Sequence, residues 1–191
     1  MAMSLLTKNQ QWWKTIENGA QNVSNRLVEL ANIKPGDKVL DIATGIGEPA
    51  ITAAKRVGSS GCVKATDLSP QMLSIAKQRA ASMGLENMME FKDGDTETIE
   101  LPASSFNAVL CRWGLMFLPN PSSALSNINR IMIPGGYLAA AVWDEVVVTS
   151  RKDAAINHIG TILGLTTLSS ANKMSSGQIF NPESYLTGCV R

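Results

Sequence analysis

Long apolar runs, paired cysteines and an excess of one charge are all missing from this sequence of 191 residues. The longest strongly apolar stretch, Tyr137 to Trp143, falls far short of the roughly 20 residues that cross a bilayer. MAMSLLTKNQ at the N-terminus is too short and polar for a secretory signal. The 17 basic and 16 acidic residues form no long runs, which argues against nucleic acid or an anionic membrane as the partner. We expect a cytoplasmic protein with small-molecule or protein partners.

Cysteine and histidine are also scarce. Cys62, Cys111 and Cys189 stand far apart, so they provide neither a CxxC pair nor a disulfide framework. This usage suits a reducing cytoplasm. The single histidine, His158, lies outside every motif described below, and a structural role is favoured over a catalytic one. We predict no metal site and assign no catalytic side chain.

Apolar residues make up 45% of the chain, enough for one domain with a sizeable core. Strands are expected at 38–42, 62–67, around Met89 and Phe91, at 106–111 and at 137–142. Helices are expected between them, because apolar residues recur at helical spacing. The three stripes are Val23, Leu27, Leu30 and Ala31; Met72, Ile75, Ala76, Ala80 and Met83; and Leu125, Ile128, Ile131 and Met132.

This alternation predicts an α/β fold, a Rossmann-like doubly wound and mainly parallel sheet with helices on both faces. Ser69 and Pro70 suit the start of one helix, Pro49 suits the first turn of another, and Gly84 suits a helix end. In such sheets ligands bind beyond the carboxyl ends of the strands, where strand order reverses. Functional residues should therefore follow the strands.

The chain divides into three expected parts. Residues 1–36 form an N-terminal helical cap, 37–145 the ligand-binding core, and 146–191 a tail of helix and loop. Within the tail, 154–165 has helical character and 166–177 is rich in Ser, Thr and Asn. No strand is expected in the tail.

The segment VLDIATGIGEPA at 39–50 indicates a glycine loop between a strand and a helix. Gly45 and Gly47 allow a tight turn and a close approach of backbone to ligand, and the helix start offers unpaired N–H groups. A tight turn without a ligand explains this motif equally well.

Two acidic residues after later strands favour a nucleoside-like ligand. Asp67 ends the second strand about 20 residues beyond Gly47, where a carboxylate can accept hydrogen bonds from both ribose hydroxyls. Asp95, in GDTETIELP at 94–102, could accept the exocyclic amine of adenine, with Leu68 and Met72 packed on the ring faces. Alternatively, Asp67 only caps a helix, and the loop around Asp95 is solvated.

In this order and spacing, the three segments resemble the motif series of class I S-adenosylmethionine-dependent methyltransferases. SFNAVLCRWGLMFLPNP at 105–121 and IMIPGGYLAAAVW at 131–143 resemble the branch that includes the ubiquinone and menaquinone biosynthesis C-methyltransferases. The resemblance implies S-adenosylmethionine as cofactor and assigns it a set of residues. They are Asp41, Ala43, Thr44, Gly45 and Gly47 on the methionine side; Asp67 at the ribose; Leu68, Met72, Gly94, Asp95 and Thr96 at adenine; and Arg112 or Trp113 at the pocket ceiling.

Arg112 has two readings: it pairs with the cofactor carboxylate, or it makes a salt bridge at the sheet rim. The acceptor implied by the resemblance is a small quinone-like, aromatic or lipid-like molecule. Its pocket should use Trp13, Met116, Phe117 and Trp143, with Trp12 and Asp144 nearby, although core packing explains each aromatic too.

Class I methyltransferases usually end in two further strands, which we expect this chain to lack, as a C-terminal truncation. The fifth strand would then be an exposed edge, which favours a homodimer. Such a chain could bind S-adenosylmethionine without catalysis.

A Rossmann NAD(P)-dependent oxidoreductase is a further alternative. It is disfavoured because Ala50 replaces the third glycine of G-x-G-x-x-G and no Tyr-x-x-x-Lys follows Tyr137 or Tyr185.

Overall fold

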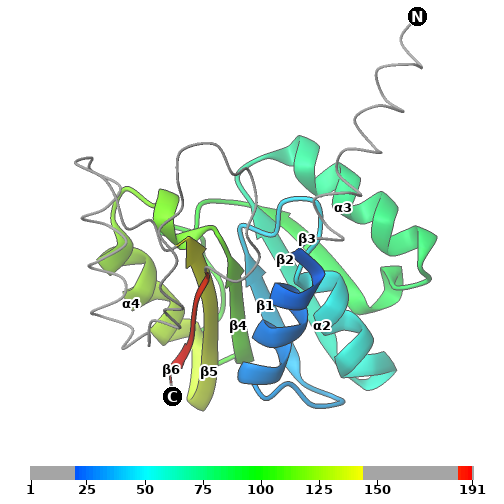
Figure 1. Cartoon of the computed structure of the whole chain (residues 1–191), viewed down its shortest axis with the longest axis horizontal. Coiled ribbons are helices and arrows are strands. Elements are labelled where there is room, and N and C mark those ends of the chain that lie inside the picture. The colour runs from blue at the N-terminus through cyan, green and yellow to red at the C-terminus, as the bar shows by residue number, and fades with distance from the viewer. Residues whose placement is uncertain (1–19, 144–184, 191) are drawn as a thin grey trace, which may run out of the picture.

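In the computed structural model, residues 20–143 and 185–190 are described (Figure 1). Within these residues one sheet has the strand order β3-β2-β1-β4-β5-β6. Its first five strands are parallel, and β6 is antiparallel to β5. The predicted Rossmann-like doubly wound sheet is confirmed. The strands are β1 (Lys38–Ile42), β2 (Cys62–Asp67), β3 (Met89–Asp93), β4 (Phe106–Arg112), β5 (Met132–Trp143) and β6 (Tyr185–Val190).

Helices cover both faces of the sheet (Figure 1). The helical segment 20–30 and helices α2 (Ala50–Val57) and α3 (Pro70–Ser82) lie on one face, and α4 (Pro121–Ile131) lies on the other. Two apolar clusters correspond to this division: one joins segment 20–30 and α2 to the sheet, and the other joins α4 to it.

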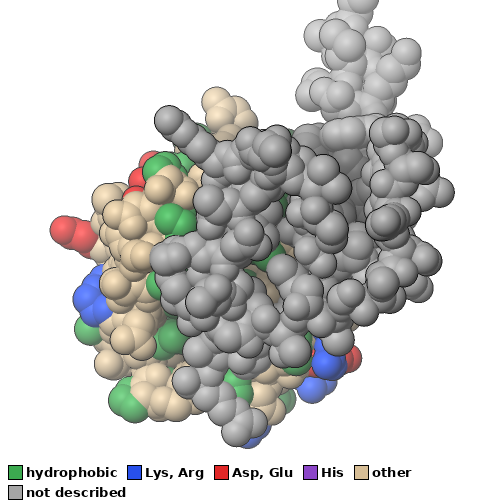
Figure 2. All heavy atoms as spheres, turned by 60° about the vertical axis from the view of Figure 1, so that its left-hand side comes forward, with side chains coloured by type: hydrophobic (Ala, Val, Ile, Leu, Met, Phe, Trp, Pro, Cys, Tyr) green, Lys and Arg blue, Asp and Glu red, His purple; other side chains and the backbone are tan. Residues whose placement is uncertain are grey.

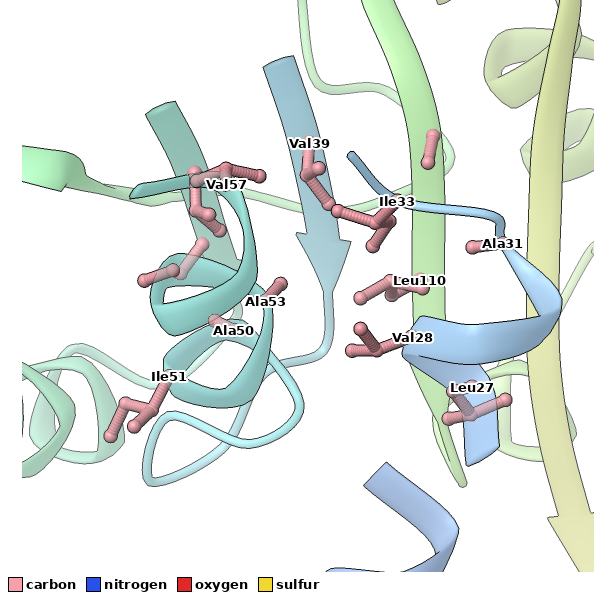
Figure 3. Close-up of a cluster of buried hydrophobic side chains, with 14 of the residues drawn as sticks. Leu27, Val28, Ala31, Ile33, Val39, Ala50, Ile51, Ala53, Val57 and Leu110 are labelled. Carbon is pink, nitrogen blue, oxygen red and sulfur yellow. The ribbon is translucent and has the colours of Figure 1, made fainter. Parts of the chain in front are cut away.

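The first cluster docks segment 20–30 against the middle of the sheet. Val28 points from this helix toward Leu110 of β4, with Ala53 of α2 alongside (Figure 3), and Leu27 belongs to the same cluster. Leu27 and Leu110 are fully buried. Burying a leucine side chain contributes about 1.5–3 kcal/mol, so this contact fixes the helix firmly beside β1 and β4.

Strand order reverses at β1, which pairs with β2 on one side and β4 on the other. The carboxyl ends of these three strands therefore lie at one edge of the sheet, and their loops diverge there. A doubly wound sheet binds ligands at this position.

Two details of the predicted helices need correction. Ser69 is the N-cap of α3, as predicted, and its Oγ accepts a hydrogen bond from the Met72 N–H at 3.3 Å. However, Leu73 rather than Met83 belongs to the buried face: Met83 is 46% exposed, because it caps the helix and the chain turns at Gly84. Similarly, Met132 does not extend the α4 stripe but begins β5.

The predicted absence of a strand from the tail is wrong, and so is the expectation that both C-terminal strands are missing, because an antiparallel strand lies beside the fifth. β6 pairs antiparallel with β5, from Leu138 opposite Val190 to Trp143 opposite Tyr185. The fifth strand is thus covered along this length, which removes the basis for a dimer through its edge. The signal was missed because YLTGCV has no clear alternation and its pairing depends on a partner far away in sequence.

The predicted helix at 154–165, the predicted loop at 166–177 and residues 1–19 lie outside the described residues. Among the helices of the described part, none has the length and apolar character needed to span a membrane. In Figure 2, charged side chains of both signs appear as isolated groups on the coloured surface around α4. This agrees with the balanced composition.

Candidate functional site

Three loops meet at the carboxyl edge of the sheet, after β1, β2 and β4, with the β3 loop beside them. They contain most of the residues that the sequence selected. Ala43 and Trp113, which follow β1 and β4 directly, both have positive φ angles, +54° and +65°. Such angles are uncommon for residues with a side chain, and they often mark functional loops.

The Asp41 side chain holds the loop after β1 in place. Its Oδ2 accepts hydrogen bonds from the Thr44 hydroxyl at 2.6 Å and from the Ala50 N–H at 3.0 Å. The carboxylate therefore ties the glycine loop to the start of α2. Its Oδ1 is also buried, and none of the described residues gives it a hydrogen bond.

The ionisation of Asp41 is displaced toward neutral pH. Burial raises its pKa from an ordinary value of 3.8 to about 7, against the lowering effects of the Thr44 and Ala50 hydrogen bonds and the Arg112 charge. Glu48, which is also buried, raises it further. A buried carboxylate that titrates near pH 7 is typical of functional sites.

The two loop glycines have different structural roles. Gly47 (φ +104°) packs against the protein: a Cβ there would lie 3.0 Å from Ile51 Cδ1 and 3.2 Å from Ala76 Cβ. At Gly45 (φ +57°) a Cβ would meet no described atom within 4 Å. The open space is therefore at Gly45, while Gly47 brings α2 and α3 together.

Asp67 is bound to the same loop. Its Oδ2 accepts a hydrogen bond from the Gly45 N–H at 2.8 Å, and its Oδ1 accepts one from the Ser69 N–H at 2.9 Å. Each oxygen keeps a lone pair for another donor. The adjacent Leu68 is 71% exposed, and Met72 is half-buried. The end of β2 thus presents a carboxylate, Asp67, and directly after it an exposed apolar side chain, Leu68.

The loop after β3 is held by α4. Asn127 Nδ2 donates to the Thr96 carbonyl at 3.1 Å, and Glu97 Oε1 accepts from the Asn120 N–H at 2.7 Å. Asp95 Oδ1 accepts from the Glu97 N–H at 2.9 Å. Thr96 is buried, and a Cβ on Gly94 would lie 2.9 Å from Ile99 Cδ1. This loop is built into the fold rather than loosely solvated.

Arg112 has a contact that neither sequence reading anticipated. Its Nη1 donates to the Ser24 hydroxyl at 3.0 Å, and its guanidinium lies 4.8 Å from the ring centroid of Trp113. Both Arg112 and Ser24 are buried. The arginine thus joins the end of β4 to the helical segment 20–30, which we call the N-terminal helix. A lone serine on a helical stripe gave no sequence signal for this.

A second polar chain connects the N-terminal helix to the glycine loop. Gln21 Nε2 donates to Thr52 Oγ1 at 2.9 Å, and the Thr52 hydroxyl donates to Glu48 Oε2 at 2.7 Å. Sequence reasoning also missed these residues, because their partners lie 31 and 4 positions away in unrelated motifs.

The predicted acceptor residues are only partly described. Met116 and Phe117 lie in a short 3₁₀ turn (Leu115–Phe117) after β4; Met116 is half-buried and Phe117 is 66% exposed. The backbone of Trp143 ends β5. Trp12, Trp13, Asp144 and His158 lie outside the described residues, as does the adjoining tail.

Thiol chemistry is disfavoured at this edge. Burial is the largest effect that raises the pKa of the Cys111 thiol to about 12, and the nearby Asp41 charge adds to it. A thiol that stays protonated is a poor nucleophile and a poor metal ligand. In the described part of the chain, no cluster of metal-ligating side chains is found.

A family profile described as a methyltransferase domain matches residues 40–140, just over half of the chain. The aklanonic acid methyltransferase DauC of a Streptomyces species is 37% identical over 117 residues, covering 61% of this chain and 53% of that protein. The ubiquinone/menaquinone biosynthesis C-methyltransferase UbiE of Xanthomonas oryzae is 33% identical over 119 residues, covering 62% and 47%. The chain spans about half the length of these curated relatives.

Solved structures show the same architecture. A SAM dependent methyltransferase from Aquifex aeolicus aligns with a TM-score of 0.63 over 86% of this chain and 88% of that one, at 22% identity. At that identity the likeness establishes the fold alone.

Proposed function

Because this chain belongs to the methyltransferase domain family, we propose that it binds S-adenosylmethionine and transfers the methyl group to a small organic acceptor. The observation that carries the proposal is the pair of carboxylates, Asp41 and Asp67, that both accept hydrogen bonds from one glycine loop. Both activity and acceptor are proposals, since the chain spans about half of its relatives' length.

The residues at the edge fit this cofactor. Asp41 carries a buried carboxylate oxygen with no hydrogen-bond partner among the described residues, and a negative charge there favours a ligand with sulfonium and ammonium groups. Gly45 leaves open space at the loop. Asp67 presents two oxygens to ribose hydroxyls, and the exposed Leu68 offers an apolar surface to adenine.

S-adenosylmethionine supplies an electrophilic methyl carbon on sulfur. The chain then has to bind, orient and exclude water, because an in-line displacement gains rate when donor and acceptor atoms are held about 3–3.5 Å apart. No side-chain nucleophile is needed. This agrees with a described site that offers carboxylates and apolar groups but no activated thiol.

For the acceptor we propose an apolar or aromatic molecule. Met116 and Phe117 follow β4 at the same edge, and Phe117 is 66% exposed. An exposed aromatic side chain beside a ligand site suits an apolar or planar molecule. The names of two relatives, which refer to quinone biosynthesis and to aklanonic acid, support an organic small molecule.

Calorimetric titration with S-adenosylmethionine and with NADH tests the cofactor. Selective binding of S-adenosylmethionine supports the proposal, and selective binding of NADH overturns it in favour of a Rossmann oxidoreductase. Radiolabelled methyl transfer to a quinol and to an aromatic carboxylic acid then tests turnover. Binding without transfer to any acceptor would favour a non-catalytic cofactor-binding module, which the partial coverage of the relatives allows.

A further inference from the structure

The N-terminal helix contacts the site through a buried cation. Arg112, 8% exposed, leaves the end of β4 and donates from Nη1 to the hydroxyl of Ser24, which is fully buried. The same nitrogen makes a longer contact of 3.5 Å with the Ala20 carbonyl. A guanidinium out of water is costly unless its donors are satisfied, so these helix groups fix where the positive charge lies.

That charge lies on the same side of the sheet as Asp41. Asp41 pairs in register with Leu110, and Arg112 stands two residues further along the same strand. Side chains two apart on a strand share a face. Leu110 faces the cluster that includes segment 20–30 and α2, so Asp41 and Arg112 both project toward that layer. The positive charge of Arg112 acts on Asp41 and lowers the pKa of its carboxyl group.

Asp41 in turn holds the glycine loop through Thr44 and Ala50. Hydrogen bonds thus join Ser24 to Arg112 and Asp41 to the loop, and the charge of Arg112 acts on Asp41 between them. We propose that Arg112 is a positioning residue: anchored by Ser24, it carries the docking of the N-terminal helix to Asp41 and so sets how well the glycine loop accepts a cationic cofactor. This inference rests on the proposed function.

The electrostatics give the path a measurable signature. The charged groups facing Asp41 are Arg112 on β4 and Glu48 before α2; the neighbouring Cys111 thiol, with a pKa of about 12, stays neutral. Arg112 lowers the pKa of Asp41, and Glu48 raises it. Removing the Arg112 charge should therefore delay ionisation of Asp41 to higher pH.

The experiment measures S-adenosylmethionine affinity by calorimetry from about pH 5 to about pH 7, where the α-amino group of the cofactor keeps most of its charge. In the unmodified chain, affinity should rise with pH as Asp41 ionises. In Arg112→Met the rise should move to higher pH; a rise of about one pKa unit from about 7 would lower the ionised fraction of Asp41, and with it the affinity at pH 7, about fivefold. Arg112→Lys keeps the charge and should restore most of the profile.

Ser24→Ala tests the anchor: alanine keeps the helix propensity of this position, although loss of the buried hydrogen bond to Arg112 should lower the stability somewhat. It should shift the rise in the same direction as Arg112→Met, but less. Gln21→Ala is the matched control: it breaks the other link from this helix, to Thr52, without touching the Arg112 path. Its profile should keep the position of the unmodified chain. Thermal melts by circular dichroism show whether each variant folds. If Arg112→Met does not fold, the pH profile of Ser24→Ala is the deciding measurement.

Identical pH profiles for the unmodified chain and Ser24→Ala would overturn the inference and leave the proposed function standing. An equal shift in Gln21→Ala would also overturn it, because docking in general and not the arginine would then control the loop. If the unmodified chain binds no S-adenosylmethionine at any pH, the proposed function fails, and the inference fails with it.

Discussion

The Asp67 carboxylate accepts a hydrogen bond from the backbone N–H of Gly45 across 2.8 Å. This contact joins the end of β2 to the turn after β1, so the residue proposed to bind ribose also fixes the loop proposed to hold the methionine part. Bonds of this kind, to an ionised acceptor, are stronger than neutral ones. A hydrogen bond therefore holds together the parts of the site proposed to bind the ribose and the methionine portion.

Asp67→Ala should weaken S-adenosylmethionine binding by about 1.5–3 kcal/mol, because it removes a charged acceptor from the site. Calorimetry measures the loss. Asp37→Ala is the matched control, since Asp37 Oδ2 also accepts a backbone N–H, from Lys34 at 2.8 Å, but at the opposite end of β1. Equal binding by Asp67→Ala and Asp37→Ala would remove Asp67 from the cofactor site.

Alanine at the two loop glycines should separate stability from binding. Gly47→Ala should lower the free energy of unfolding by about 1–3 kcal/mol, since its Cβ would press on Ile51 and Ala76 at a φ of +104°. Gly45→Ala has open space and a φ of +57°, and should cost only about 1 kcal/mol. Urea denaturation gives both values.

For cofactor affinity we expect the opposite order of the two variants. Gly45→Ala, which stays well folded, should lose more S-adenosylmethionine affinity than Gly47→Ala. Its new methyl group would enter the space that we assign to the ligand. Unchanged cofactor affinity in Gly45→Ala would place the ligand elsewhere.

Gly114 and Ala43 form a close contact between the loops after β4 and β1. A Cβ on Gly114 would lie 2.5 Å from Ala43 Cβ and 2.8 Å from Cys111 Sγ. Gly114→Ala should destabilise the protein by about 1–3 kcal/mol through overpacking. Adding Ala43→Gly should recover part of this loss, because it removes one of the two clashing groups and relieves a positive φ. Strictly additive effects in this double-mutant cycle would contradict the contact.

The stability of the protein should depend on the ionisation of Asp41. Its pKa is raised from 3.8 to about 7, so between these values the folded state holds more protons than the unfolded state. The free energy of unfolding contributed by this group is fully present below about pH 4 and is lost as pH rises through about 7. The loss is at most about 4 kcal/mol.

Asp41→Asn should abolish this dependence, because an amide does not titrate, while its oxygen can still accept from Thr44 and Ala50. Urea unfolding of both proteins across about pH 4–8 measures the difference. Asp93→Asn, which removes a carboxylate from an exposed position, controls for net charge. Parallel curves for the unmodified chain and Asp41→Asn would show that Asp41 does not titrate in this window.

Local signals in the sequence were sufficient for the first five strands and for the cap at Ser69. In VLDI at 39–42 all four residues are buried and Asp41 is the single polar one, which suits a strand covered on both faces, and Ser69 with Pro70 combines two independent start signals for a helix. The glycine loop and the carboxylates at the carboxyl ends of β1 and β2 were predictable from a related rule, since parallel strands bring these ends to one edge of the sheet. Their assignment to a cofactor stays a prediction that the titrations above test.

Tertiary structure alone decided which groups meet. The pairing of β6 with β5, the docking of Ser24 on Arg112 and the hydrogen bond from Gln21 to Thr52 all join residues that no local pattern connects. Gly47 shows the same division at one residue: the sequence indicated that a side chain would not fit, but only the folded chain shows that α2 and α3, and not the ligand, occupy the space. Propensity and periodicity act over a few residues, whereas burial and charge pairing depend on the neighbours that the whole fold supplies.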